Sequence, residues 1–259
     1  MKSILLVLLI LLVSILKAQD NVTDLITDRP DQTESSAVVP HKSLQIETGF
    51  VMENDEDDLY KQNSFAYNTT LFRYGLLNNM ELRLGLEYLE DKIEDKNTGV
   101  SNTYSGAGPL YTGFKVYIFE EQNWIPEIAF LGGLIFPFSA NNNYKTAYSA
   151  GNIRFSLSHT LSERFSLGYN IGAEWDGESA APGYFYSIAL GIGLFDSFGM
   201  FVESFGIIPE DSNEEHLFDT GFTYLVMSNL QLDISGGIGI NNSAIDKFIA
   251  FGVSYRLPQ

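Results

Sequence analysis

Residues 80–88 read Met-Glu-Leu-Arg-Leu-Gly-Leu-Glu-Tyr, an alternation of apolar residues with polar or small ones. Successive side chains of a β-strand point to opposite faces, so this stretch predicts a strand with one apolar and one polar face. The same alternation recurs in residues 165–175, Phe-Ser-Leu-Gly-Tyr-Asn-Ile-Gly-Ala-Glu-Trp, and again in residues 230–240. The pattern therefore predicts an all-β fold.

Twelve runs with this alternation can be followed along the chain. They cover residues 43–53, 65–75, 80–90, 107–119, 124–138, 148–160, 164–175, 183–195, 198–208, 216–226, 229–241 and 246–257. Most are about 10–13 residues long, and a tilted strand needs about 9–11 residues to cross the hydrocarbon core of a membrane. The length of the runs thus favours membrane-spanning strands.

The connections between these runs alternate in length. Short ones are residues 76–79, 120–123, 161–163, 196–197 and 227–228, and long polar ones are residues 54–64, 91–106, 139–147, 176–182, 209–215 and 242–245. Outer-membrane barrels have short periplasmic turns and longer external loops. Residues 43–259 are therefore predicted to form a transmembrane antiparallel up-and-down β-barrel of about 12 strands, with both termini periplasmic.

Composition narrows the functional classes. The chain has 259 residues, no Cys, and 33 acidic against 15 basic residues, which gives a net charge of -18. The absence of Cys excludes a disulfide scaffold, a thiolate metal site and a Cys nucleophile. The acidic balance argues against a nucleic-acid partner, because phosphate contacts require clustered Lys and Arg.

The N-terminus has the features of an export signal. Lys2 is followed by an apolar run from Ile4 to Leu16, and the small residue Ala18 offers a cleavage site. A charged start, a short apolar core and a small residue at the cut predict a cleaved signal peptide over residues 1–18. We interpret the chain as a protein exported by a Gram-negative bacterium.

Residues 19–42 are polar and do not alternate, and Pro30 and Pro40 disfavour a ladder strand there. One interpretation is a periplasmic tail. The other is a plug that folds into the barrel mouth, with Asp28, Arg29 and Asp31 as its charged residues. In that case Arg29 is expected to bind Glu47, Glu81 or Glu203, since a guanidinium group matches a carboxylate.

The charged residues on the polar faces of the runs are expected to line the lumen. They are Glu47, Arg73, Glu81, Arg83, Glu87, Lys115, Glu127, Arg154, Glu174, Glu203, Asp219, Asp233 and Arg256. Ionised groups inside a barrel are stable only if they are paired or hydrated. Two interpretations remain open: a salt-bridge network that makes the barrel rigid, and a pore lining that selects solutes.

No active site or cofactor site is predicted. The chain has three histidines, His41, His159 and His216, and Ser158 beside His159 would face the opposite side of its strand. The acidic residues 53–58 offer carboxylates to a hard cation, but they lack the glycine spacing of a calcium loop. A solvated acidic loop without metal is the favoured interpretation.

Several short motifs occur in a characteristic order. Residues 26–33 read Ile-Thr-Asp-Arg-Pro-Asp-Gln-Thr, residues 73–76 read Arg-Tyr-Gly-Leu, residues 81–85 read Glu-Leu-Arg-Leu-Gly, and residues 106–108 read Gly-Ala-Gly. In this order, along nearly the whole mature chain, they resemble the outer-membrane transporter family labelled "meta-pathway of phenol degradation". The resemblance implies a barrel that passes small molecules, hydrophobic ones included, and it implies no enzyme activity.

The sequence thus predicts a monomeric barrel, surrounded by outer-membrane lipid, for passive transport of small solutes, hydrophobic or aromatic ones among them. The alternative is a plugged barrel with a structural or surface-binding role and no transport. An open lumen that conducts ions distinguishes the first function from the second.

Overall fold

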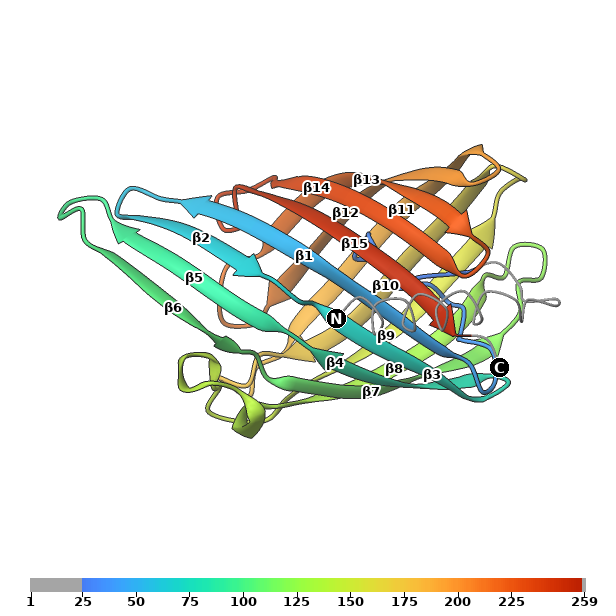
Figure 1. Ribbon diagram of the computed structural model, residues 1–259, viewed down its shortest axis with the longest axis horizontal. Coiled ribbons are helices and arrows are strands. Elements are labelled where there is room, and N and C mark those ends of the chain that lie inside the picture. The colour runs from blue at the N-terminus through green and yellow to red at the C-terminus, as the bar shows by residue number, and fades with distance from the viewer. Residues whose placement is uncertain (1–24, 258–259) are drawn as a thin grey trace, which may run out of the picture.

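The computed structural model describes residues 25–257, so the predicted signal peptide, residues 1–18, lies outside the described residues. All strands belong to one antiparallel sheet that closes on itself (Figure 1). The closing contact joins β1 (Leu44–Glu56) to β15 (Lys247–Leu257), in register from Leu44 opposite Leu257 to Asn54 opposite Lys247. The first and the last strand therefore complete a barrel.

The sheet has fifteen strand segments, which form twelve continuous strands around the barrel, here called staves. Three staves are each interrupted once: β2 (Tyr60–Ala66) continues as β3 (Thr70–Leu77), β4 (Met80–Leu86) as β5 (Tyr88–Asp95), and β6 (Ser101–Ala107) as β7 (Leu110–Phe119). The others are β1, β8 (Glu127–Phe136), β9 (Ala150–Thr160), β10 (Phe165–Trp175), β11 (Gly183–Phe195), β12 (Phe198–Pro209), β13 (Glu215–Met227), β14 (Leu230–Gly239) and β15. The predicted antiparallel barrel of twelve strands is confirmed.

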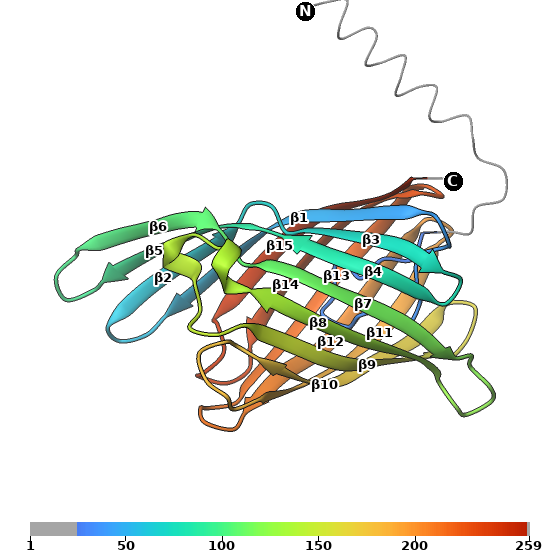
Figure 2. The same cartoon turned by 90° about the horizontal axis from the view of Figure 1, so that it is seen from below.

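The interruption between β2 and β3 is a bulge. Glu47 of β1 pairs with Leu71, whereas Val51 pairs with Ala66, so four steps on β1 oppose five on the neighbouring stave. An extra residue of this kind bends a strand and increases its twist. Beyond this level β1, β2, β5 and β6 continue past the other strands as a projecting four-stranded sheet, which Figures 1 and 2 show at one end of the barrel.

Two of the predicted long loops are instead mostly strands of the projecting sheet. Residues 54–64 and 91–106 were expected to be long loops, but their turns are confined to residues 57–59 and 96–100. Most of the remaining residues are paired in the ladder. Their side chains are polar on both faces of the sheet, as in Lys-Gln-Asn-Ser at residues 61–64, so no apolar periodicity marks them as strands.

The distribution of side chains is the reverse of that in a soluble protein. The largest fully buried side chains include Arg73, Lys115 and Glu81. Apolar side chains on the opposite face are exposed, for example Leu84 at 39% and Ile171 at 56%. A broad exposed apolar band suits contact with lipid rather than water.

Aromatic residues border this apolar band at both ends. Tyr74, Phe195 and Tyr224 are exposed near the end with the short turns, and Tyr88 and Tyr184 are exposed toward the other end. Aromatic side chains at two levels are typical of the interfaces between membrane and water. Among the described residues, no helix is long and apolar enough to span a bilayer.

A charge on the outer face tests this assignment of faces. Leu84→Arg and Ile171→Arg should each impair assembly, with a cost of about 2–4 kcal/mol near the bilayer midplane. The matched control is Val100→Arg, at an exposed apolar position in the tip between β5 and β6, outside the apolar band. We expect the yield of folded, heat-modifiable barrel to fall for the first two variants only. Equal yields for all three would show that the apolar band does not face lipid.

Candidate functional site

Residues 25–43, here called the inner segment, lie inside the barrel and then lead into β1. Apart from an isolated bridge between His41 and Gly75 they belong to no strand, and several of their backbone N–H groups find partners on inward-facing side chains instead of a ladder. These contacts are Asp28 N–H to Glu47 at 3.1 Å, Gln32 N–H to Glu203 at 2.7 Å, Glu34 N–H to Asn170 at 2.7 Å, and Val39 N–H to Glu81 at 2.7 Å. The inner segment is thus held from several sides of the lumen.

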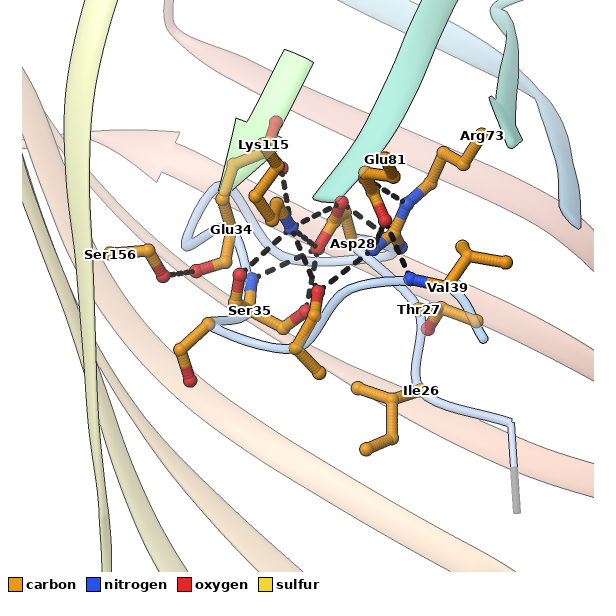
Figure 3. A network of polar contacts seen from close by, with 12 residues as sticks. Ile26, Thr27, Asp28, Glu34, Ser35, Val39, Arg73, Glu81, Lys115 and Ser156 are labelled. Atoms are coloured by element: carbon orange, nitrogen blue, oxygen red, sulfur yellow. Dashed lines mark hydrogen bonds and ion pairs between the residues drawn. The ribbon is translucent and has the colours of Figure 1, made fainter. Parts of the chain in front are cut away.

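Asp28 is the centre of the contacts of the inner segment (Figure 3). Its carboxylate lies 3.0 Å from Arg73 Nη1, 2.8 Å from Arg83 Nη1 and 2.9 Å from Lys115 Nζ. The side chains of all four residues are at most 3% exposed. Three buried cations from β3, β4 and β7 therefore converge on one carboxylate supplied by the inner segment.

Further carboxylates complete the charge balance of this cluster. Arg73 also contacts Glu47 at 2.7 Å and Glu81 at 2.8 Å, and Arg83 contacts Glu34 of the inner segment at 2.8 Å. Three cations thus face four carboxylates, two of which come from the inner segment. Buried charges require this kind of close pairing, because desolvation of an unpaired ion is costly.

Arg29 makes a separate contact. Its Nη2 donates to Asp233 Oδ1 at 3.2 Å and to the carbonyl oxygen of Phe251 at 3.1 Å, while Nη1 lies 3.4 Å from Thr69 Oγ1. Arg29 therefore reaches the wall near the junction of the first and last strands.

The predicted partners of Arg29 were wrong. Glu47 and Glu81 bind Arg73 instead, and Glu203 accepts hydrogen bonds from the inner segment at Gln32 and Thr33. The sequence indicated that carboxylates would face Arg29, but the order of charges around the lumen depends on strand register.

A pair of carboxylates lies on β12 and β13. Glu203 and Asp219 occupy directly opposite positions, and both residues are 1% exposed. Thr33 donates to Glu203 at 2.5 Å, whereas neither oxygen of Asp219 has a hydrogen-bond partner within residues 25–257. Asp31 of the inner segment makes no ion pair among the described residues.

The structure places the thirteen predicted lumen residues at inward-facing positions, but they do not form one cluster. Arg154 donates to the carbonyl of Gln32 at 3.3 Å and lies 3.8 Å from Glu174. Glu127 accepts a bond from Ser36 at 2.5 Å. Glu87 lines a cavity beside the inner segment, and Arg256 is buried next to Asn229 near the end of β15.

Some residues that join the inner segment to the barrel wall were not predicted from the sequence, namely the neutral Asn170 and Ser156 of the wall and Glu34 of the segment. Asn170 and Ser156 both donate to the carbonyl of Glu34, and Glu34 itself pairs with Arg83. Asn170 and Ser156 lie on the polar faces of their strands. Their signal was therefore present in the alternation, but only charged residues were selected from it.

The acidic residues of the tip between β1 and β2 have local roles. Asp57 accepts the N–H groups of Tyr60 and Leu59, which lower the pKa of its carboxyl. Glu56 bonds to Lys96 at 3.0 Å, and this contact lowers the pKa of Glu56. Within the described part of the chain, no group of three or more acidic or histidine side chains is arranged to hold a metal ion.

His159 and His216 each pair with a tyrosine side chain. His159 stacks on Tyr169 and lies 3.5 Å from Glu121, while Ser158 bonds to Ser36 inside the barrel. His216 shares a 2.8 Å hydrogen bond with Tyr186. His159 and Ser158 thus face opposite sides of β9.

The inner segment separates two cavities. One, of about 460 Å³, lies toward the projecting sheet, and its lining includes Glu53, Glu215 and Phe248. The other, of about 360 Å³, opens toward the short turns at Ser162 and Arg164. Arg29, Pro30 and Asp31 line both cavities, so this short stretch forms the partition between them.

The chain was compared with known protein families. The model of the family described as "Putative MetA-pathway of phenol degradation" matches residues 27–257. This match confirms the resemblance found in the sequence. No curated protein sequence matches the chain.

Solved structures share the fold. One is an outer membrane channel from Pseudomonas putida F1, at 12% identity, with 88% of this chain and 98% of that chain covered and a TM-score of 0.63. A second is the KdgM porin in complex with disordered oligogalacturonate, at 9% identity, with 82% of this chain and 98% of that chain covered and a TM-score of 0.53. A third is the translocator domain of the autotransporter NalP from Neisseria meningitidis, at 10% identity, with 83% of this chain and 88% of that chain covered and a TM-score of 0.53. At these identities the similarity concerns the fold, which is that of outer-membrane β-barrels.

Asp28→Asn tests the role of the central carboxylate. The substitution removes the one carboxylate that all three buried cations contact, so the inner segment should lose roughly 3–5 kcal/mol of its attachment. We expect the segment to become accessible to protease in the folded barrel. Asp31→Asn is the matched control, because Asp31 lies in the same segment without an ion pair. Protection of the Asp28→Asn segment at the level of the control would contradict the role of Asp28.

Proposed function

The chain belongs to the family described as "Putative MetA-pathway of phenol degradation", and on that premise we propose that it is an outer-membrane channel for passive diffusion of small solutes. The observation that carries this proposal is the combination of a closed barrel, an apolar outer band, and cavities of about 460 and 360 Å³ on the two sides of Arg29–Asp31 in a polar lumen. Two cavities that meet at the short stretch Arg29–Asp31 suit a path for small solutes through the barrel.

The orientation of the proposed channel follows from its turns. Leu44 and Leu257 pair at the end that carries the short connections. Short turns are periplasmic in outer-membrane barrels, so both termini are assigned to the periplasm and the projecting sheet to the cell exterior. Each chain closes its own barrel and encloses its own lumen, which supports a monomer as the transporting unit.

The inner segment is proposed to act as the plug. It fills the middle of the lumen, and its residues Arg29–Asp31 separate the exterior cavity from the periplasmic one. Its attachment includes many ion pairs and hydrogen bonds. Polar contacts of this kind can be exchanged for water one at a time, which suits a segment that shifts while the barrel stays intact.

The exterior cavity favours small amphipathic solutes. Phe205, Phe248 and Leu217 line it together with the carboxylates of Glu53 and Glu215. An aromatic ring with polar substituents matches such a surface, since the ring packs on apolar side chains and its substituents bond to polar ones. Phenol, which the family description names, belongs to this solute class.

A sealed barrel with a structural role is the second candidate. The density of buried ion pairs around Asp28 favours it, because such a network can serve rigidity alone. Conductance separates the two functions, since a sealed barrel passes no ions.

Removal of the plug tests the proposed channel. Deletion of residues 20–40 should raise single-channel conductance in a planar bilayer several-fold, because the partition between the cavities is lost. Heat-modifiable gel mobility should show that the barrel still assembles, since the ladder from β1 to β15 does not include the deleted residues. If the assembled deletion variant and the full chain both fail to conduct, the barrel is not a channel.

Location provides an independent test. The mature protein should sediment with outer membranes and migrate faster before boiling than after it, because a closed barrel has no edge strand from which to unfold. Recovery in the soluble periplasmic fraction would contradict the membrane assignment.

A further inference from the structure

We propose that the lumen contains a binding site for a guanidinium or primary ammonium group, which Arg29 of the chain itself occupies, and that solutes bearing such a cation open the channel by displacing Arg29. This inference rests on the proposed channel function and adds the charged group that a solute must carry to open the channel. It concerns the site here called the glycine notch: Gly49, Gly252, Asp233, Thr69 and the carbonyl of Phe251.

The glycine notch is shaped for a planar cation. Gly49 and Gly252 lie directly opposite each other in the pairing of β1 with β15, and Asp233 of β14 lies opposite Gly252. A Cβ atom at either glycine would come within 2.5 Å of Arg29 Nη2, so a guanidinium group fits there only because both side chains are absent. Glycine in a strand commonly marks the close approach of another group.

Its chemistry is that of a cation site. The groups facing the guanidinium are a carboxylate, a backbone carbonyl and a hydroxyl oxygen, all of which accept hydrogen bonds. The Asp233 side chain is fully buried, and its Oδ2 has no hydrogen-bond partner in the described part of the chain. Departure of Arg29 would leave a buried, unpaired carboxylate, so another cation is favoured in its place.

The notch can be reached from the exterior. Arg29 lines the exterior cavity of about 460 Å³ and a second one of about 380 Å³ that includes Thr69 and Glu87. The side chain of Arg29 is 15% exposed while that of Asp233 is buried, so an arriving solute meets the guanidinium group first. Glu53, Glu87 and Glu215 line these two cavities, and carboxylates in a cavity raise the local concentration of cations.

Displacement of Arg29 has a defined consequence for the path. Arg29, Pro30 and Asp31 form the partition between the exterior and periplasmic cavities, while the preceding Asp28 is fixed by Arg73, Arg83 and Lys115. Release of Arg29 therefore frees the partition and leaves the anchor in place. The chain's own arginine acts as a tethered competitor of the solute.

Planar-bilayer recordings of the full chain at low ionic strength test this proposal. Millimolar guanidinium chloride on the exterior side should raise conductance several-fold. Tetramethylammonium chloride, which has the same charge but no N–H donor, should not. Arg29→Ala should conduct at the raised level without guanidinium and respond little to it.

A second variant tests the notch itself. Gly252→Ala introduces a Cβ into the position of the guanidinium and should also raise basal conductance. Gly193→Ala is its matched control, a strand glycine whose added Cβ would meet only ordinary contacts at 3.7 Å. Heat-modifiable mobility identifies assembled barrels, and Arg29→Ala, which changes no wall residue, decides the question if Gly252→Ala does not assemble.

The outcomes separate the two proposals. Wild-type conductance in Arg29→Ala, or equal responses to guanidinium and tetramethylammonium, would overturn the notch as a solute site. If deletion of residues 20–40 nevertheless raises conductance, the channel function stands and only the notch fails. If that deletion leaves the assembled barrel non-conducting, the channel function itself fails.

Discussion

The buried cations of the lumen impose the central constraint on this molecule. Arg73, Arg83 and Lys115 lie on three neighbouring staves, and the barrel wall alone gives them only Glu47 and Glu81 as close partners. The missing negative charge comes from the inner segment, through Asp28 and Glu34. The N-terminal segment thus supplies, inside the barrel, carboxylates that pair with these buried cations.

Neighbouring residues of the inner segment are held with different strength. Asp28 is held by three buried cations, whereas its neighbour Arg29 is held by one oxygen of Asp233, a backbone carbonyl and a weak contact to Thr69. The anchoring residue Asp28 and the first residue of the partition, Arg29, are thus adjacent in sequence, but Arg29 is held by weaker contacts. A segment built in this way can shift locally without leaving the lumen, which reconciles a filled barrel with the proposed passage of solutes.

Much of the fold could be predicted from alternation. The runs at residues 80–88 and 164–175 show which side chains face outward, because apolar and polar or small residues alternate there without a break. The projecting sheet could not be found in this way, since residues 61–64 are polar on both faces. The partner of Arg29 could not be predicted from the sequence either. Asp233 and Glu203 are both acidic residues on the polar face of a strand, and the register of β12 to β15 is what brings Asp233 beside Gly252.

The position of the inner segment also dictates an order of biogenesis. This segment leaves the ribosome before any strand, yet its binding site includes Asp233 of β14 and the carbonyl of Phe251 in β15, which are synthesised last. Its site does not exist until the final strand closes the wall. During insertion the cations of the early strands must therefore be hydrated or neutralised by other means, and docking of the segment marks the completion of the barrel.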